Sequence, residues 1–395
     1  MIRPTVARVD LGALASNYRR IAEFVRAERD AGVPGDGQPR RGAARGATGC
    51  GVIAVVKANA YGHGSVQVAK ALEAAGADLL ACADIEEGAT LRAAGVTADI
   101  LVFGALSVSD LDGLFDCRLT PTISTPGAAR AVQAAASKYR QRIAYHLKID
   151  TGMNRLGFRY DNLQRTLPEL LASENLTLSS VYTHFGTADM PEHPLFETQR
   201  RRFDAVLQQI AGSRTNPAPL PPFIHAANSA AILRDSRVWF DRVRPGLLLY
   251  GVVPLPLAST LDLRPVMSLH SRVVAVKGMR PGDASGYGAR FAAERPTTVA
   301  VIPAGYADGL DLRLAGRGAV LIRGRRAPVV GSVCMDMLMA DVTGMDVSPG
   351  DEVVIVGSQG DDRIDVREMA ATIGSIPWEV LCRVGSRIER IYDEK

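Results

Sequence analysis

The sequence has no long apolar run. No stretch approaches the ~20 consecutive apolar residues that a membrane span needs, and the first residues, Met1 to Thr5, lack the apolar core of a secretory signal. These absences predict a soluble, cytoplasmic protein with no membrane partner.

Cysteine is scarce, and neither sign of charge is in large excess. The five cysteines form no CxxC pair and are odd in number, so they predict neither a disulfide framework nor a zinc site, and we expect no bound metal. Lysine and arginine number 46 against 42 acidic residues, a net charge of +4 with no basic stripe. Nucleic acid is therefore not an expected partner. The cysteines are Cys50, Cys82, Cys117, Cys334 and Cys382.

The chain is rich in apolar residues, and they occur in short runs. With 395 residues and 47% hydrophobic content, it is long enough for two domains. Over residues 1–258, eight short apolar runs alternate with helical patterns, which predicts an α/β fold of the (β/α)8 TIM-barrel type. A doubly wound open sheet is the competing architecture, but no GxGxxG turn follows any of the runs. The runs span residues 52–57, 79–83, 100–104, 120–123, 144–149, 178–184, 223–227 and 241–244, and helical patterns include 65–75, 84–94, 126–138 and 195–211.

Other segments depart from this alternation. Residues 30–51 are rich in Gly, Arg and Ala without periodicity, which predicts a flexible surface insertion. From residue 259 onward the apolar spacing changes to two, so residues 259–395 are predicted to form a C-terminal, mostly-β domain with a helix near 365–374. Ahead of the barrel strands we expect a strand at 6–9 and a helix capped by Asp10.

Polar residues stand at the carboxyl ends of five predicted strands, which is where barrels of this kind carry their reactive groups. Lys57 is the most informative, because it follows a fully apolar run. Lysine is rarely buried without a reason, and desolvation lowers the pKa of its amine and makes it nucleophilic. The alternative is a surface lysine where the strand leaves the core. The strand-end residues are Lys57, Lys148, His184, Asn228 with Ser229, and Arg244.

The residues around Lys57 carry a longer pattern. The stretch from Val55 to Gly64, VVKANAYGHG, closely resembles the lysine motif that binds pyridoxal phosphate (PLP) in the alanine racemases. The resemblance covers essentially the whole chain, with residues 30–51 as its main departure. Its further motifs are Lys148 to Gly157, Thr183 to Asp189, Asn228-Ser229, Arg244 to Gly246, Gly286 to Ala289, Gly305 to Gly309 and Cys334 to Asp336.

This resemblance implies two catalytic bases. Lys57 would form the Schiff base with PLP and then act on one face of the substrate Cα, and Tyr287 would act on the other face. Inversion needs such a pair, because a planar carbanion that is reprotonated from the same side returns the starting enantiomer. For Tyr287 the plain alternative is an aromatic residue in the turn after Gly286.

The resemblance also implies how the cofactor is held. Arg244, beside His184, would face the pyridine nitrogen, and because arginine does not give up its proton the ring would stay neutral. The phosphate would be bound by hydroxyls and helix-terminal amides. In this chain Trp378 stands where the family usually has a tyrosine, and an indole cannot supply that hydroxyl. The implied phosphate-site residues are Tyr61, Asn228, Ser229, Gly246, Leu247 and the Trp378 position.

The resemblance implies that Arg155 reaches both the phenolic oxygen of the cofactor and the carboxylate of the substrate. Tyr306 and the backbone of Met335 would line the substrate pocket. In the family Tyr287, Tyr306 and Met335 enter the site from a partner subunit, so the resemblance implies a homodimer with shared active sites, and alanine as the small-molecule partner.

Lys148 is expected to point into the barrel mouth beside Arg155, on the strand face that it shares with Asp150. Two neighbouring cations repel each other, and the family resolves this by carbamylation of the lysine, which converts a cation into an anion. An unmodified ammonium paired with Asp150 is the alternative.

The function that the resemblance implies is PLP-dependent interconversion of L- and D-alanine, which supplies D-alanine for peptidoglycan. An amino-acid racemase of broader range would share every motif. A barrel-type decarboxylase of basic amino acids would not need the tyrosine base, and a non-catalytic PLP carrier would consist of one barrel, without residues 259–395.

Overall fold

The computed structural model describes residues 4–30, 50–106, 111–211, 221 and 223–393. The chain forms two structural units, which we call the barrel unit (Ala15–Lys57 and Val68–Arg264) and the sheet unit (Met1–Leu14, Ala58–Gln67 and Pro265–Lys395). The insertion predicted at 30–51 lies, apart from its ends, outside the described residues. The predicted division between residues 258 and 259 treats each domain as one continuous stretch, whereas both units draw on several.

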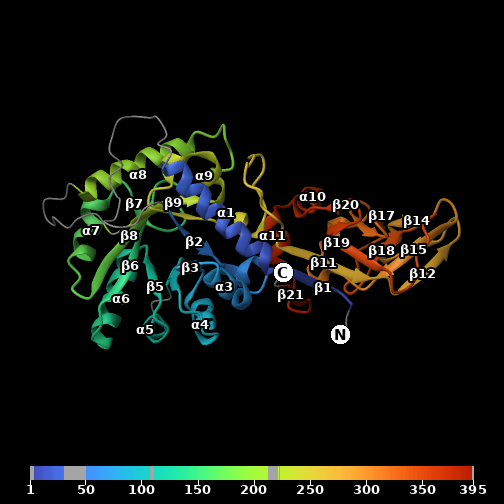
Figure 1. Ribbon diagram of the computed structural model, residues 1–395, viewed down its shortest axis with the longest axis horizontal. Helices are drawn as coiled ribbons and strands as arrows, with labels where there is room; N and C mark the ends of the chain where they lie inside the picture. Colours follow the sequence, from blue (N-terminus) through green and yellow to red (C-terminus); the bar gives the residue numbers. More distant parts are fainter. Residues whose placement is uncertain (1–3, 31–49, 107–110, 212–220, 222, 394–395) are drawn as a thin grey trace. The chain divides into compact units, whose positions relative to one another are not determined.

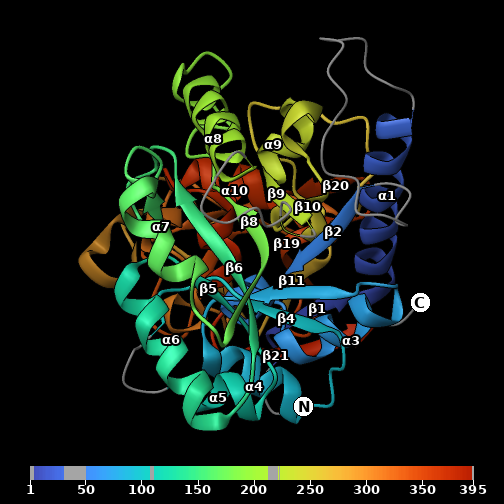
Figure 2. The same ribbon diagram turned by 90° about the vertical axis from the view of Figure 1, so that its left-hand side faces the viewer.

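The barrel unit contains eight parallel strands, each within two residues of the predicted run: β2 (Gly51–Val55), β3 (Leu79–Cys82), β4 (Asp99–Val102), β5 (Thr120–Ile123), β6 (Ile143–Asp150), β8 (Leu176–Tyr182), β9 (Phe223–Asn228) and β10 (Arg242–Arg244). Their order is β5-β4-β3-β2-β10-β9-β8-β6, and pairing of β5 with β6 closes the ring (Figure 2). The short β7 (Phe158–Arg159) adds to β6. The predicted barrel is confirmed.

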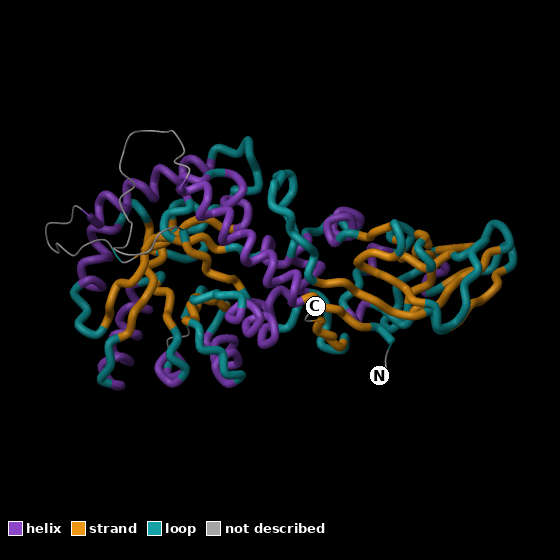
Figure 3. The backbone as a smooth tube through the Cα atoms, in the orientation of Figure 1, coloured by secondary structure: helices purple, strands orange, loops and turns teal. Residues whose placement is uncertain are grey.

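Helices surround the strands of this unit (Figure 3). Their starts follow local hydrogen bonding: the Asp84 carboxylate accepts from Glu87 N at 2.8 Å, and the Thr125 hydroxyl accepts from Ala128 N at 3.1 Å. Within the described ranges, none is both long and apolar enough to cross a membrane. The helices are α1 (Leu11–Asp30), α3 (Ser65–Ala74), α4 (Ile85–Ala93), α5 (Asp112–Asp116), α6 (Pro126–Tyr139), α7 (Leu163–Leu171), α8 (Leu195–Ala211) and α9 (Ser229–Arg234). For α5, α7 and α9 the sequence predicted helices between the strands without giving their bounds.

The sheet unit is built on a mixed sheet in the order β12-β15-β18-β17-β16-β19-β11-β1-β21 (Figure 1). The strand predicted at 6–9 is present as β1, and it pairs antiparallel with β11 and parallel with β21. Bounds are β1 (Val6–Asp10), β11 (Met267–Arg272), β12 (Ala275–Met279), β15 (Thr297–Ile302), β16 (Ala319–Ile322), β17 (Arg325–Val330), β18 (Leu338–Asp341), β19 (Glu352–Gln359), β20 (Asp362–Ile364) and β21 (Glu389–Asp393), with the hairpin β13 (Ala284–Ser285) and β14 (Phe291–Ala292), and helices α10 (Val366–Thr372) and α11 (Pro377–Cys382).

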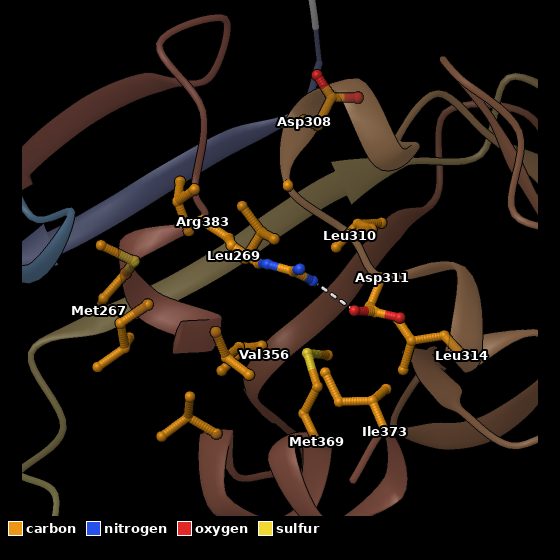
Figure 4. Close-up of a pocket in the computed structure, with 15 residues that line it drawn as sticks. Met267, Leu269, Asp308, Leu310, Asp311, Leu314, Val356, Met369, Ile373 and Arg383 are labelled. Atoms are coloured by element: carbon orange, nitrogen blue, oxygen red, sulfur yellow. Dashed lines mark hydrogen bonds and ion pairs between the residues drawn. The ribbon is translucent and has the colours of Figure 1, made fainter. Parts of the chain in front are cut away.

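A small apolar cavity of about 30 Å³ lies in the core of the sheet unit, between β11, β19, α10 and α11 (Figure 4). Met267, Leu269 and Met369 are among its lining side chains, and the Arg383–Asp311 ion pair lies beside it. A void of this size leaves its lining without van der Waals partners on one side.

Filling this cavity should stabilise the protein. Val366 lines the cavity and is 7% exposed, so Val366→Ile should raise the free energy of unfolding by about 0.5–1 kcal/mol, the value of one buried methyl group. Val320→Ile, in the fully packed β16, is the matched control and should lower it. Urea unfolding of both variants measures these free energies. If Val366→Ile lowers the free energy of unfolding as much as Val320→Ile does, the void cannot accept a methyl group.

Candidate active site

The chain leaves β2 through an unusual turn. Lys57 is half-buried, and the four residues after it, Ala58, Asn59, Ala60 and Tyr61, all have φ of 52° or 53°. A left-handed turn of non-glycine residues costs roughly 1–2 kcal/mol per residue. We call residues 58–62 the left-handed turn; its own hydrogen bonds include Gly62 N to Ala58 O at 3.0 Å. Such strain is concentrated at functional sites.

Lys148 is the centre of a group of cations in the barrel. It is 6% exposed, and burial lowers the pKa of its amine to about 8, helped by the positive charges of Arg155, Arg244 and Lys57. The negative charge of Asp150 raises the pKa of Lys148 and so opposes this shift. The structure therefore brings four of the predicted site residues together, and it gives them a strongly positive environment.

Arg244 is 4% exposed, and its guanidinium is held from several sides. Nη2 donates to Thr183 O and Ala226 O, both at 2.8 Å, and contacts His184 Nδ1 at 3.3 Å, while Nη1 donates to His225 Nδ1 at 2.7 Å. Among the described residues these contacts leave Nε–H and one Nη1–H without an acceptor. Burial lowers the pKa of Arg244 to about 10, so the group stays charged at neutral pH.

Behind Arg244 lies a pair of histidines that the sequence analysis missed. His225 accepts from Arg244 at Nδ1, so its proton is on Nε2, from which it donates to His146 Nδ1 at 3.1 Å. Burial lowers the pKa of His146 to about 3 and that of His225 well below the usual value. Tyr182 stacks on His225 at 4.5 Å. Both histidines are therefore neutral. Their polar side chains inside otherwise apolar strands were the available sign.

His184 follows β8 and accepts from Arg244 through Nδ1. Burial and the charge of Arg244 lower its pKa well below the usual value, so it too is neutral.

Two helix N-termini meet where the sequence predicted the phosphate site. Asn228 caps α9 through its Oδ1, which accepts from Ala231 N at 3.0 Å. The Ser229 hydroxyl accepts from Gly246 N at 2.9 Å, where the 3₁₀ turn Leu247–Tyr250 begins. The first amides of a helix have no partner within it, and helix starts of this kind commonly bind anions.

Tyr61 and Trp378 lie in the sheet unit, on two neighbouring segments. Leu381 O, in the same helix as Trp378, is so near Gly62 that a Cβ there would come within 2.2 Å of it. Tyr61 is buried, and burial raises the pKa of its hydroxyl strongly. Trp378 is half-buried.

The predicted substrate residues of the sheet unit lie on exposed loops. Tyr287 is 78%, Met335 52% and Tyr306 43% exposed. Tyr287 and Met335 line one hollow of about 670 Å³, together with Met279, Met337 and Met339. Ser332 Oγ donates to Tyr287 O at 2.6 Å and fixes the backbone of that turn.

The loops of Tyr306 and Met335 are joined to each other. Tyr306 N donates to Cys334 O at 3.0 Å, and a Cβ on Gly305 would lie 2.3 Å from the Cys334 and Met335 carbonyl oxygens. Arg387 links both loops, since Nη2 bonds Asp336 at 2.6 Å and Nε lies 3.7 Å from Asp308. The sequence analysis did not identify Arg387 or Asp308 as site residues.

The pKa of Lys148 predicts a change of stability with pH. Between pH 8 and 10.5 the unfolded state keeps a proton on this lysine that the native state has lost, so raising the pH through this window should stabilise the native state, by up to about 3 kcal/mol. Lys148→Met should lack this rise. Urea unfolding in CO₂-free buffer without PLP measures it, with exposed Lys70→Met as the control. Identical pH profiles for wild type and Lys148→Met would contradict the assignment.

The sequence and the structure were compared with known proteins. Residues 40–254 match the family described as alanine racemase, N-terminal domain, and residues 266–392 match alanine racemase, C-terminal domain. An alanine racemase of Carboxydothermus hydrogenoformans is 38% identical over 99% of this chain and 100% of that protein. The structure of alanine racemase from D-cycloserine-producing Streptomyces lavendulae matches with a TM-score of 0.88 and 31% identity, and the match covers 100% of this chain and 98% of that one. The structure of alanine racemase from Bacillus anthracis with bound L-Ala-P matches with a TM-score of 0.85 and 33% identity, and the match covers 100% of this chain and 96% of that one. The chain belongs to the alanine racemase family.

Proposed function

We propose that this protein interconverts L- and D-alanine at a PLP-dependent site in the barrel mouth, by a two-base mechanism, and that it supplies D-alanine for peptidoglycan in the cytoplasm. The observation that carries the proposal is the group of four cations, Lys57, Lys148, Arg155 and Arg244, beside an anion-binding pair of helix N-termini. Family membership supports the reaction. A racemase of broader range is the alternative.

The residues present fit PLP. A dianionic phosphate matches the Ser229 hydroxyl and the amides of Gly246 and Leu247. When bound, PLP supplies an aldehyde that condenses with an amine, and a ring that withdraws electrons from the substrate Cα–H bond. The remaining N–H donors of Arg244 suit the pyridine nitrogen. Because Arg244 keeps its proton at neutral pH, negative charge stays near Cα, which favours return of a proton there over transamination.

Proton movement at Cα falls to Lys57 and Tyr287. Each takes a proton from one face of Cα or returns one to it, and inversion results when one takes and the other returns. Arg155 is suited to hold the substrate carboxylate, because its guanidinium can bind both oxygens. His184 and His225, neutral and bonded to Arg244, hold that guanidinium in place.

We further propose a homodimer in which the sheet unit of each copy completes the site of the other. The exposed Tyr287, Tyr306 and Met335 are large apolar or amphipathic residues gathered on adjoining loops, a pattern typical of surfaces covered in assemblies. The methionine-lined hollow below Tyr287 suits such a contact.

Lys148 is proposed to be carbamylated. Three cations lower its pKa and only Asp150 opposes them, so an anion at this position would remove repulsion and could orient Arg155. Trp378 is proposed to stand where the family usually has a tyrosine, and its indole supplies no hydroxyl there.

Lys57→Ala should lower racemisation by on the order of 10³-fold or more, because it removes the amine that is proposed to bind the cofactor and to act on one face of Cα. Covalent retention of PLP through denaturation and borohydride reduction should disappear with it. The readouts are a chiral assay against all common L-amino acids and the mass of the reduced protein. Retained activity would refute the assignment, and wild-type activity on many amino acids would favour the broader racemase.

Tyr287→Phe should separate the two bases. The family resemblance assigns the tyrosine to L-alanine and the lysine to D-alanine. In deuterated water, Lys57 should therefore still exchange the α-proton of D-alanine without inverting it, while L-alanine stays largely unlabelled. Mass spectrometry of the separated enantiomers gives the result. Equal labelling of both, or undiminished racemisation, would remove Tyr287 as the second base.

Mixing inactive Lys57→Ala and Tyr287→Phe subunits should restore up to about half of the wild-type activity per heterodimer, because one of its two sites has both bases. Subunit exchange is verified by native mass spectrometry with one tagged chain. Exchange without recovered activity would argue that each site is made by one chain.

A further inference from the structure

The left-handed turn that follows Lys57 needs an outside support. Four consecutive non-glycine residues with φ near +52° are unfavourable on their own. Local hydrogen bonds offset part of this cost, among them Gly64 N to Asn59 O at 2.9 Å and Ser65 N to Asn59 Oδ1 at 2.8 Å, and contacts from distant segments add to them. The turn begins at the residue after Lys57, contains Tyr61 and ends at Gly62. Its conformation therefore affects two of the predicted site residues.

The support comes from the last part of the chain. Leu381 O presses on Gly62, and the Tyr392 hydroxyl lies so near Gly64 that a Cβ there would be 1.9 Å away. Directly after the turn, the buried His63 ring contacts Ala60 O at 2.9 Å through Nδ1. These contacts define the turn's surroundings sterically, but they do not bond its terminal carbonyl.

Arg390 makes that bond. Its Nε donates to Gly62 O at 2.9 Å, across 328 residues of sequence. The other side of the same guanidinium donates to three carbonyls of the segment before β21: Nη1 to Gly385 O and Ile388 O, and Nη2 to Val384 O, at 2.7–2.9 Å. One planar group thus ties the turn to a segment that is itself fixed in the sheet through β21 and β1.

The guanidinium is committed to this role. Arg390 is half-buried, and among the described residues it has no carboxylate partner; it donates four hydrogen bonds to backbone carbonyls. A charged donor strengthens hydrogen bonds to carbonyls, and the fork of five N–H groups reaches acceptors in several directions at once. A lysine has a single terminal nitrogen and cannot span the two segments in this way.

We propose that Arg390 is a positioning residue that holds the left-handed turn in its strained conformation and thereby fixes Lys57 and Tyr61 for the cofactor. The effect on the cofactor rests on the function proposed above, whereas the effect on the turn does not.

Arg92 offers a matched control. It is also half-buried, and its guanidinium makes the same set of contacts to carbonyls: Nε to Cys117 O, Nη1 to Val96 O and Ala98 O, and Nη2 to Arg118 O. All of these lie in the barrel unit and none belongs to the left-handed turn. Arg92→Lys and Arg390→Lys therefore remove equivalent hydrogen bonds at two different places.

The experiment is hydrogen exchange of the full-length protein without added PLP, read at the amides of Gly62, His63, Gly64 and Ser65. We expect Arg390→Lys to speed their exchange at least tenfold while the β19 amides stay unchanged, and Arg92→Lys to leave all of them at the wild-type rate. Unchanged exchange at residues 62–65, or acceleration shared by the whole sheet unit, would overturn the proposal. If Arg390→Lys does not fold, Arg390→Met, which keeps the apolar stem, takes its place under the same criteria.

The second measurement is the rate at which PLP leaves the loaded enzyme, followed by absorbance after dilution. Release should be at least fivefold faster from Arg390→Lys and unchanged from Arg92→Lys. A wild-type protein that never holds PLP would contradict the proposed function and leave the exchange result standing. Faster exchange with an unchanged release rate would overturn the claim that the turn positions the cofactor residues.

Discussion

Buried positive charge at the mouth of the barrel is the constraint on which the rest of the site depends. Lys148 and Arg244 are almost fully buried, and Lys57 and Arg155 add to the field around them. Burying like charges together is unfavourable unless anions or strong acceptors compensate them. The carbonyls of Thr183 and Ala226 do so for Arg244. The remaining imbalance makes this region a binding place for anions.

The neutral histidines are a consequence of the same field. Each acceptor nitrogen that faces Arg244 must lack a proton, which fixes the tautomers of His184 and His225 and, through His225, of His146. A protonated imidazole at any of these places would add another cation to the group. His225 and His146 thus hold the guanidinium of Arg244 in place without adding a further positive charge.

The sequence predicted the barrel strands because most of their residues are buried, so that they appear as short, largely apolar runs between polar turns. It did not reveal the partners of β1, since strand pairing across more than 250 residues leaves no local pattern. The strand-end rule and the family motifs located Lys57, Lys148 and Arg244. The left-handed turn was not predicted, because Ala58, Ala60 and Tyr61 disfavour positive φ, and one asparagine, which tolerates it as a single residue, does not indicate a run of four. His146, His225 and Arg387 act through other residues, and such roles depend on distances that only the fold supplies.

The exposed loops that carry Tyr306 and Met335 are held together by contacts within the sheet unit. Backbone bonds and the close approach at Gly305 make the two loops one body, and Arg387 ties both Asp308 and Asp336 to it. Residues that are ordered before association lose little further conformational entropy when a partner covers them. The backbones at Tyr306 and Met335 are therefore held at a fixed distance from each other by the sheet unit itself, and only their exposed side chains are left to adjust.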